Sequence, residues 1–299
     1  MKLNGVEIED TFAEAFDMQV ARILFTAATP EWAKTAALST AGFATSVIEC
    51  KVEAGIDRVI PAAETPDGRP GITLLFAALT TKDLVKQLRK RTGQCILTCP
   101  TTAVFNALDD ATEWADVGNQ LRYFGDGFED RKRVGDKFLM WRIPVIEGEF
   151  IIDEKFGIAK GVGGGNLILM GKTPEGTLKA AEAAVAAIHE VDGCVAPFPG
   201  GICRSGSKVG ANRHQFLKAT TNTRLCPTLR EQVPDSLVPK GVTSVYEIVL
   251  NGLSRPAVEA GMRAGLHAAT KSPDLVRASA VNFDGKLGQH KIYLKNLVD

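Results

Sequence analysis

The sequence has little that would mark a metal enzyme, a membrane protein or a nucleic-acid-binding protein. Histidine occurs four times in 299 residues, and none stands at a metal-binding spacing with another ligand type. No Ser-His-Asp pattern is visible either. Lysine plus arginine equals aspartate plus glutamate, at 35 each, so no net charge attracts nucleic acid or a membrane surface. We therefore expect no metal, no nucleic acid and no membrane partner.

Long apolar runs and disulfide signatures are also missing. No apolar run reaches the roughly 18–20 residues that span a bilayer. Residues 1–16 mix acidic with apolar side chains, unlike a signal peptide. The six cysteines are scattered, several of them within apolar segments, a pattern typical of buried, reduced thiols. These features predict a cytoplasmic protein.

What the sequence does contain is an internal repeat with a constant offset of 144 residues. Thr29-Pro30-Glu31 recurs as Thr173-Pro174-Glu175. The same offset relates further matches: Phe12 with Phe156, Ala36-Ala37 with Ala180-Ala181, and Cys50 with Cys194. Repeats of this length are whole domains. We expect two domains, residues 1–146 and 147–299, and positions that differ between the copies indicate residues selected for function.

Each copy reads as strand–helix–strand followed by a second strand–helix–strand. In the first copy we expect strands at residues 20–27, 43–50, 72–78 and 95–99, and helices at 32–41 and 82–92. In the second copy we expect strands at 166–170, 194–196, 242–250 and 275–280, and helices at 174–189 and 256–270. Two split βαβ units per copy predict an α+β protein of two tandem ferredoxin-like lobes.

One segment of the first copy, residues 109–149 approximately, has no counterpart in the second. Its runs at 121–124 and 138–145 predict an antiparallel β-ribbon that leaves the lobe. Such a ribbon is a natural oligomerisation arm.

The glycine cluster at residues 161–165 does not predict a nucleotide site. A dinucleotide fingerprint follows a strand and opens a helix, whereas these glycines precede a predicted strand. A near match to a phosphate loop ends at Gly171-Lys172-Thr173, but its spacer has five residues instead of four. We expect a flexible or close-packed turn and no nucleotide cofactor.

Two neighbouring features of the second copy favour an anionic ligand. Phe198-Pro199-Gly200-Gly201 forms a stiff loop after a predicted strand. Residues 204–230 then contain six Lys or Arg and no Asp or Glu. Lys208 and Arg213 are the candidate anion-binding residues, and Lys208 is the closer of the two to the loop. A solvated basic face is the alternative interpretation.

Glu247 is the best catalytic candidate. Strand alternation places it on the same face as Val245 and Val249. Burial among valines would raise the pKa of its carboxyl group, as is common at functional sites. The matching position in the first copy is Thr73, so the fold does not require a carboxyl group there. An exposed edge position is the alternative interpretation.

Glu247 lies in one of several unusual stretches that resemble the formylmethanofuran–tetrahydromethanopterin formyltransferase family, and the resemblance extends over essentially the whole chain. The stretches are residues 4–16, 64–71, 197–202, 245–249, 251–253 and 285–288. The resemblance implies two ferredoxin-like lobes, no metal, and formyl transfer between a furan-amine carrier (methanofuran or methylofuran) and N5 of tetrahydromethanopterin. Both carriers would be co-substrates, with no tightly bound cofactor.

The resemblance also implies a homotetramer, and similarity to the version in methylotrophic bacteria suggests a place in a larger formyltransferase/hydrolase complex. It adds Asn251 to the substrate-binding candidates, beside Phe198, Pro199, Gly200, Gly201, Lys208 and Arg213. Glu247 would donate to an oxyanion or shuttle a proton. Two alternatives remain open. One is a cysteine-dependent acyltransferase that uses Cys203, and the other is a non-catalytic scaffold subunit that binds partners through residues 109–149.

Overall fold

The computed structural model describes residues 1–134 and 138–299 and shows a mixed α+β protein, as the sequence predicts. Contacts divide the chain into two compact units, one of Met1–Asp17 with Val162–Asp299 and one of Met18–Gly161. The division falls inside two long strands, β3 (Phe12–Thr26) and β11 (Phe156–Gly171). The domain limits expected from the sequence, at 146 and 147, remain a prediction.

The internal repeat is visible in the secondary structure. β3 begins at Phe12 and β11 begins at Phe156, which are the two repeat-matched phenylalanines. Helices α1 (Pro30–Ala41) and α5 (Pro174–His189) start at the matched prolines. Their caps also match, since the side chains of Thr29 and Thr173 each accept a backbone hydrogen bond from the first turn. The offset of 144 therefore relates equivalent elements.

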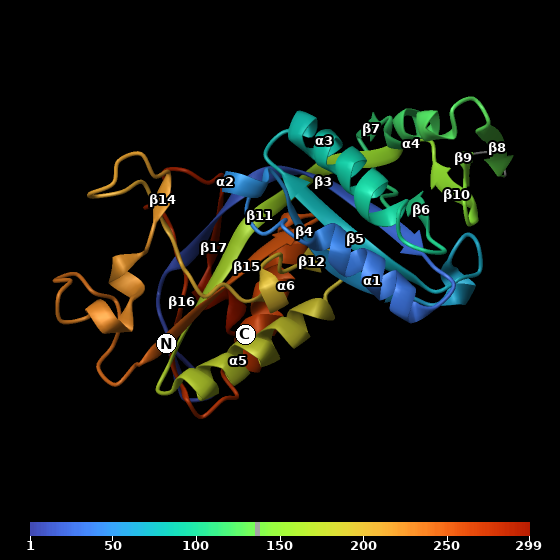
Figure 1. Ribbon diagram of the computed structural model, residues 1–299. Helices are drawn as coiled ribbons and strands as arrows, with labels where there is room; N and C mark the ends of the chain where they lie inside the picture. The colour runs from blue at the N-terminus through green and yellow to red at the C-terminus, as the bar shows by residue number, and fades with distance from the viewer. Residues whose placement is uncertain (135–137) are drawn as a thin grey trace. The chain divides into compact units, whose positions relative to one another are not determined.

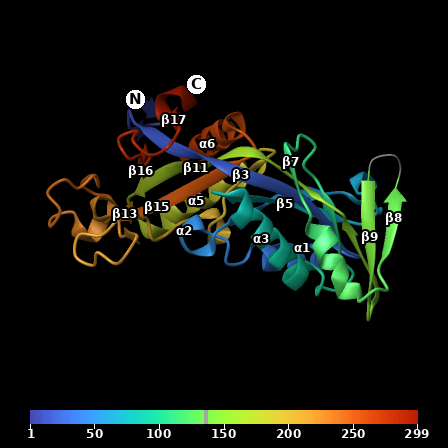
Figure 2. The ribbon, with the colours of Figure 1, turned by 90° about the horizontal axis from the view of Figure 1, so that it is seen from above.

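The unit that contains the chain termini has a sheet with two helices on one face. Antiparallel β15 (Ser244–Gly252) and β16 (Leu275–Ser279) both pair with β11. α5 and α6 (Arg255–Ala269) lie side by side against this sheet (Figures 1 and 2), and the apolar core lies between the helices and the sheet. The remaining strands are β1 (Lys2–Leu3), β2 (Val6–Ile8), β12 (Cys194–Val195), β13 (Lys208–Val209), β14 (Ala219–Thr220) and β17 (His290–Tyr293).

The second unit repeats this plan. β5 (Gly71–Ala78) pairs antiparallel with both β3 and β4 (Glu53–Ile60), and α1 and α3 (Thr81–Arg91) pack on β5. The other elements are α2 (Val47–Cys50), β6 (Ala103–Asn106), β7 (Glu113–Ala115), α4 (Val117–Leu121), β8 (Asp130–Val134), β9 (Phe138–Val145) and β10 (Gly148–Asp153).

Two expected strands of the first copy are wrong. Residues 43–50 hold the short helix α2, which Ser46 caps by accepting a hydrogen bond from the backbone of Ile48, and the strand β4 follows it. Residues 95–99 continue α3 through a wide π-helical turn, Thr92–Ile96, so that the strand β6 starts only at Ala103. Apolar composition alone does not separate a short strand from a helix end.

The insertion at residues 109–149 is only partly a ribbon. β9 pairs antiparallel with β8 and with β10, as expected for residues 138–145. Residues 121–124, expected as a strand, instead close α4 and enter a 3-10 turn, Arg122–Gly125. β10 pairs in parallel with β6, so the ribbon extends the sheet edge rather than leaving the lobe. Residues 135–137 of the insertion lie outside the described residues.

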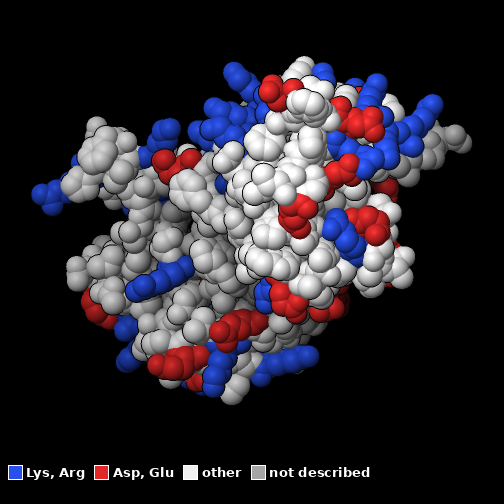
Figure 3. Space-filling view, turned by 45° about the vertical axis from the view of Figure 1, so that its right-hand side comes forward, with Lys and Arg blue, Asp and Glu red and all other residues white. Residues whose placement is uncertain are grey.

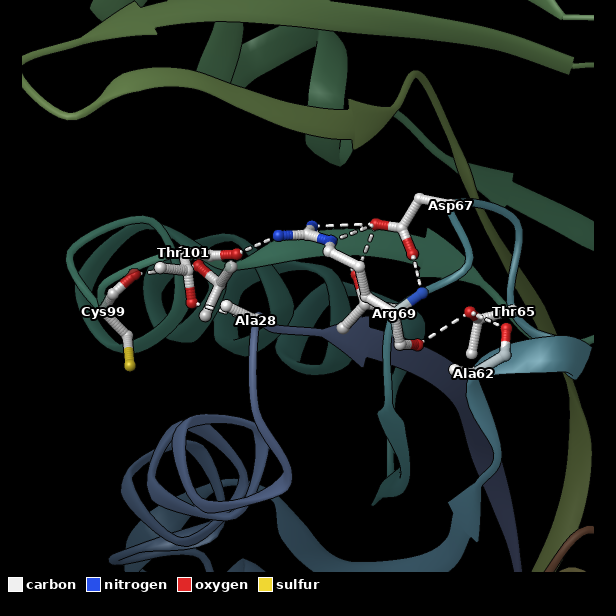
Figure 4. A network of polar contacts seen from close by, with 9 residues as sticks. Ala28, Ala62, Thr65, Asp67, Arg69, Cys99 and Thr101 are labelled. Atoms are coloured by element: carbon white, nitrogen blue, oxygen red, sulfur yellow. Dashed lines mark hydrogen bonds and ion pairs between the residues drawn. The ribbon is translucent and has the colours of Figure 1, made fainter.

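One of the family-like stretches, residues 64–71, acts as a structural clamp (Figure 4). The Arg69 guanidinium donates to Asp67 Oδ2 at 2.9 Å and to the carbonyl oxygen of Thr101. Thr101 has a φ of 65°, which is strained for a β-branched residue. Ala28 N also donates to Thr101 Oγ1, at 3.0 Å. These bonds tie the ends of β3 and β5 to the segment that precedes β6.

In Figure 3 basic and acidic side chains lie next to one another on the face that is drawn. Within the described residues, no helix has both the length and the apolar composition needed to cross a bilayer.

Candidate functional site

Glu247 lies in the middle of β15 and lines a cavity of about 160 Å³. Its backbone pairs with Ile168 of β11 on one side. On the other side it forms an isolated antiparallel bridge with Cys203, in which Cys203 N donates to Glu247 O at 2.7 Å and Glu247 N donates to Cys203 O at 3.0 Å. Two neighbouring backbones therefore fix the position of this carboxyl group.

The electrostatics of Glu247 agree with the expectation from the sequence. Burial raises the pKa of its carboxyl group to about 7, although a hydrogen bond from the Cys203 thiol lowers it in part. Val245 lines the same cavity, which confirms that alternation brings this valine and Glu247 to one face. A carboxyl group with a pKa of about 7 can both donate and accept a proton near neutral pH.

The walls of the cavity come mostly from the long connection between β12 and β15. The polar lining residues beside Glu247 are Cys203, Arg204, Ser205, Asn222, Cys226 and Thr228. The Cys203 thiol lies 3.4 Å from the Ser205 hydroxyl, and the Cys226 thiol donates to the carbonyl oxygen of Asn222 at 3.4 Å. Ile168, Leu225, Val245 and Pro227 supply apolar surface. The cavity thus offers several hydrogen-bonding groups around one partly protonated carboxyl.

The predicted loop at Phe198 approaches the site along the chain but does not line the cavity. Pro199–Gly201 forms a 3-10 turn in which Gly200 and Gly201 have φ of 62° and 77°. A Cβ atom on Gly201 would lie 2.6 Å from a methyl group of Val185 on α5, so only glycine fits there. Phe198 is half-buried, and Pro199 and Gly200 are exposed. The turn directs the chain into Cys203, the backbone partner of Glu247.

The basic segment lies partly at the cavity and partly beyond it. Arg204 lines the cavity, whereas Lys208 and Arg213 do not. Lys208 is on β13, where its Nζ donates to the carbonyl oxygen of Thr221 at 3.0 Å. Arg213 is exposed in the loop between β13 and β14. Their role in binding an anion remains a prediction.

Asn251 lies on the same strand as Glu247 but is fully buried. Its Oδ1 accepts a hydrogen bond from Gly164 N at 3.1 Å. Gly164 has a φ of 85° and lies at a β-bulge in β11, so the glycine cluster is part of a strand and not a turn before it. This contact explains Asn251 as a support of the bulge, while substrate binding by Asn251 remains a prediction.

Sequence reasoning missed the lining residues Ser205, Asn222, Cys226 and Thr228. All four lie inside the acid-free segment, and no periodicity distinguishes them because the segment has little regular structure. Within residues 1–134 and 138–299, no group of three or more His, Cys, Asp and Glu side chains is arranged to hold a metal ion.

Comparison with known proteins assigns the family. The family model described as formylmethanofuran-tetrahydromethanopterin formyltransferase matches residues 1–145, and that of the proximal lobe of the same enzyme matches residues 148–297. A relative of this name from Archaeoglobus fulgidus is 50% identical over 297 residues, covering 99% of this chain and 100% of the relative. One from Methanopyrus kandleri is 50% identical over 300 residues, with the same coverage.

Two solved structures are similar over their whole length. The formylmethanofuran:tetrahydromethanopterin formyltransferase from Methanosarcina barkeri has 47% identity and a TM-score of 0.96, over 99% of this chain and 100% of that chain. A chain of the formyltransferase/hydrolase complex from Methylorubrum extorquens, solved with methylofuran, has 45% identity and a TM-score of 0.97, over 100% and 99%. The chain belongs to the formylmethanofuran–tetrahydromethanopterin formyltransferase family.

Proposed function

We propose that this protein transfers a formyl group between a furan-amine carrier, of the methanofuran or methylofuran type, and N5 of tetrahydromethanopterin. The family match over the whole chain supports the reaction class. The observation that carries the mechanism is Glu247, whose carboxyl group has a pKa of about 7 and lines a cavity of about 160 Å³.

The transfer is direct, within a ternary complex. The amine nitrogen of one carrier attacks the carbonyl carbon of the formyl group on the other, and a tetrahedral intermediate with a negatively charged oxygen forms. The bond to the first carrier's nitrogen then breaks. The attacking nitrogen loses one proton and the leaving nitrogen gains one, so the protons balance without a covalent enzyme intermediate. Positioning of the two carriers lowers the barrier by several kcal/mol.

Glu247 is suited to these proton transfers. In its protonated form it can donate a hydrogen bond to the developing oxyanion or a proton to the leaving nitrogen, and as a carboxylate it can accept the proton of the attacking amine. Loss of one such group typically costs about 10²–10³ in rate. The Ser205, Asn222 and Thr228 side chains in the cavity are further candidates for holding the formyl oxygen.

The size of the cavity suits the reacting end of the carriers. A volume of about 160 Å³ is smaller than the roughly 300–1,000 Å³ of sites that enclose drug-sized ligands. The formyl group and its nitrogens fit inside, while the remainder of each carrier extends over the surrounding surface. Arg204, Lys208 and Arg213 would attract anionic tails of the carriers there.

The family also supports finer proposals about assembly. We propose two tandem ferredoxin-like lobes with limits near 146 and 147, a cytoplasmic location and a homotetramer. Membership in a formyltransferase/hydrolase complex is the alternative assembly, since the related chain from Methylorubrum extorquens comes from such a complex. No tightly bound cofactor and no metal are required, because both carriers act as co-substrates.

One rival mechanism has an observation in its favour. Cys203 lines the same cavity as Glu247, and its thiol donates a hydrogen bond to the Glu247 carboxyl group. A thiol nucleophile would therefore be correctly placed to take the formyl group. Glu247 would then be its base. The two mechanisms differ in which side chain is indispensable.

The deciding experiment is a spectroscopic formyl-transfer assay of the purified chain alone, with a formylated furan carrier and tetrahydromethanopterin. Glu247→Gln should lose most of the activity and Cys203→Ala should keep most of it. Glu182→Gln, an exposed change on α5, is the control. An inactive Cys203→Ala beside an active Glu247→Gln would establish the rival mechanism. No transfer by the unmodified chain would support the scaffold reading.

A further inference from the structure

Glu14 is a buried carboxylate that the proposed reaction does not use. It is 1% exposed, on β3, and its two oxygens accept four backbone hydrogen bonds from one loop. Phe283 N and Gly285 N donate to Oε2 at 2.6 and 2.9 Å, and Leu287 N and Gly288 N donate to Oε1 at 2.6 Å each. Four amides of this loop thus converge on one side chain.

The bonds keep Glu14 ionised. Burial alone would raise the pKa of its carboxyl group, but the four backbone donors outweigh burial and lower the pKa below its ordinary value. The loop is shaped to this anion. A Cβ atom on Gly288 would lie 2.5 Å from the carbonyl oxygen of Ala15, so the chain can approach β3 only with glycine at this position. The family-like stretch 285–288 is therefore a cradle for Glu14.

The loop that binds Glu14 is also hydrogen-bonded, at Val281, to β11, the strand whose Ile168 lines the Glu247 cavity. Asn166 lies two residues before Ile168 on β11, on the same face of the strand, about 7 Å away at roughly 3.3 Å per residue. The Asn166 side chain accepts a hydrogen bond from Val281 N at 2.7 Å and donates to Val281 O at 3.1 Å. The loop therefore starts close to the cavity and ends at the Glu14 anchor.

Between these two anchors the loop presents an aromatic ring. The Phe283 ring lies 6.3 Å from that of Phe16, with an angle of 57° between the ring planes. Phe16 is two residues from Glu14 on the same face of β3. Both rings are half-buried, which leaves part of each open. A Cβ atom on Gly164 would lie 3.1 Å from the Phe16 ring, so the ring packs closely against the glycine backbone of the bulge in β11.

We propose that Phe16 and Phe283 bind the planar ring of one carrier, and that Glu14 is a positioning residue that holds the 283–288 loop, and with it Phe283, in place. This inference rests on the proposed function. The ligand class is a planar heteroaromatic ring, which both the furan carrier and the pterin contain, and aromatic side chains bind such rings by stacking and edge contacts. The reacting group then reaches Glu247 along β11.

Steady-state kinetics test the ring site. Phe283→Ala should raise KM for one carrier by about tenfold, which corresponds to ~1.4 kcal/mol, and leave kcat within about threefold, because binding and not chemistry is affected. The carrier whose KM rises identifies the ring. Tyr293→Ala is the matched control, since Tyr293 forms a similar pair with Phe12 at 5.3 Å on the same strand. If the KM for each carrier is the same in Phe283→Ala as in the parent, the proposal is overturned.

Glu14→Gln tests the positioning role in the same assay. An amide keeps the size but offers a donor where two backbone donors need an acceptor, so part of the loop loses its anchor. It should raise KM for the same carrier as Phe283→Ala does, and the double variant should be no worse than the more impaired single variant. A loss of kcat with unchanged KM for both carriers would contradict the role.

Limited trypsin digestion tests the loop without any turnover, so that failure of the proposed reaction stays distinguishable. The Lys286 side chain is 75% exposed, and Glu14 holds the Leu287 amide, which belongs to the Lys286–Leu287 bond that trypsin cleaves, together with the next amide, that of Gly288. Cleavage after Lys286, followed by mass spectrometry, should be slow in the parent and at least about tenfold faster in Glu14→Gln, because local opening controls proteolysis.

Addition of one carrier should slow that cleavage in the parent but not in Glu14→Gln. Tetrahydromethanopterin and the furan carrier are added separately, so the protecting carrier should match the one found by kinetics. Should Glu14→Gln fail to fold, Phe283→Ala, which keeps all four anchoring amides, carries the protection test alone. Cleavage unaffected by either carrier in the parent would refute the ring site even in an enzyme that transfers formyl groups.

Discussion

Thr73 and Glu247 occupy equivalent positions in the two copies of the repeat. Thr73 pairs with Leu24 across β3 and β5, and Glu247 pairs with Ile168 across β11 and β15, while Leu24 and Ile168 are 144 positions apart. Thr73 is buried and donates to Asp57 Oδ2 at 3.0 Å, and Arg22 Nε donates to the same oxygen at 2.7 Å. In the first copy this position therefore contacts a salt bridge between Arg22 and Asp57. In the second copy the equivalent position carries the Glu247 carboxyl group, which lines a cavity.

This difference predicts the effect of removing the acid. Glu247→Gln should lower kcat by about 10²-fold or more, the scale of a lost acid, base or oxyanion donor, with little change in either KM. Circular dichroism and melting establish that the variant is folded. Near-normal turnover in a folded Glu247→Gln protein would remove Glu247 from the mechanism, whatever the result with Cys203→Ala.

The pH dependence should follow the Glu247 carboxyl group. If its protonated form assists the reaction, kcat should be constant below its pKa of about 7 and fall about tenfold per pH unit above it. Because the pKa in the folded state is above the ordinary value of 4.5, the folded state holds the proton more tightly. The stabilisation is present below pH 4.5 and is lost as the pH rises through 7.

Glu247→Gln cannot ionise, so the two effects separate in this variant. At pH 8 it should be more stable than the parent by ~1–3 kcal/mol, the order of magnitude that such a shift represents, and the difference should shrink towards pH 5. Urea titrations at both pH values measure it. Equal stability at pH 8 would mean that burial does not raise the pKa of this group.

The sequence predicted the site best where a pattern of period two applied. Alternation along β15 placed Glu247 with Val245, and the structure adds the desolvation that follows. It could not place Ser205 or Asn222 at the cavity, because these residues lie in a connection whose path depends on tertiary contacts such as the bridge between Cys203 and Glu247. Residues brought together by backbone bridges far apart in sequence leave no periodic signal.

The prediction of the fold was also correct where a local sequence pattern applied. It was wrong where the path of the chain depends on tertiary contacts. The helices α1 and α5 were located at residues 32–41 and 174–189, and each starts at or just after a Thr-Pro pair, which is a local signal of a helix start. The end of α3 was not, because apolar residues 95–99 suit a buried strand as well as a helix end. There the clamp between Arg69 and Thr101 fixes where the chain turns towards β6.

The basic segment predicts a salt-dependent binding step. Replacing Lys208 or Arg213 by alanine should raise KM for at least one carrier and flatten its dependence on salt, while kcat changes little, because attraction to anionic tails is screened over about 10 Å at 0.1 M salt. Arg213, which is exposed, should show the purer charge effect, whereas Lys208 also binds the Thr221 carbonyl. An unchanged KM for both carriers at low and high salt would leave the segment as a solvated face.

Assembly through the insertion is testable without deleting it. Deletion of residues 109–149 would remove β9, which pairs with β10 and buries Ile143 in the core, so a smaller particle could reflect unfolding.

A surface substitution in the insertion avoids this problem. Ile146 projects fully into solvent at the turn after β9 and, with Phe124, which is 64% exposed, lines an apolar surface groove. Exposed apolar groups of this kind mark protein interfaces. Ile146→Asp should therefore give smaller particles in sedimentation velocity with an unchanged melting curve. Val59→Asp, at an apolar position on β4 that is 71% exposed, should not. If Ile146→Asp sediments as the parent does, the subunits meet elsewhere.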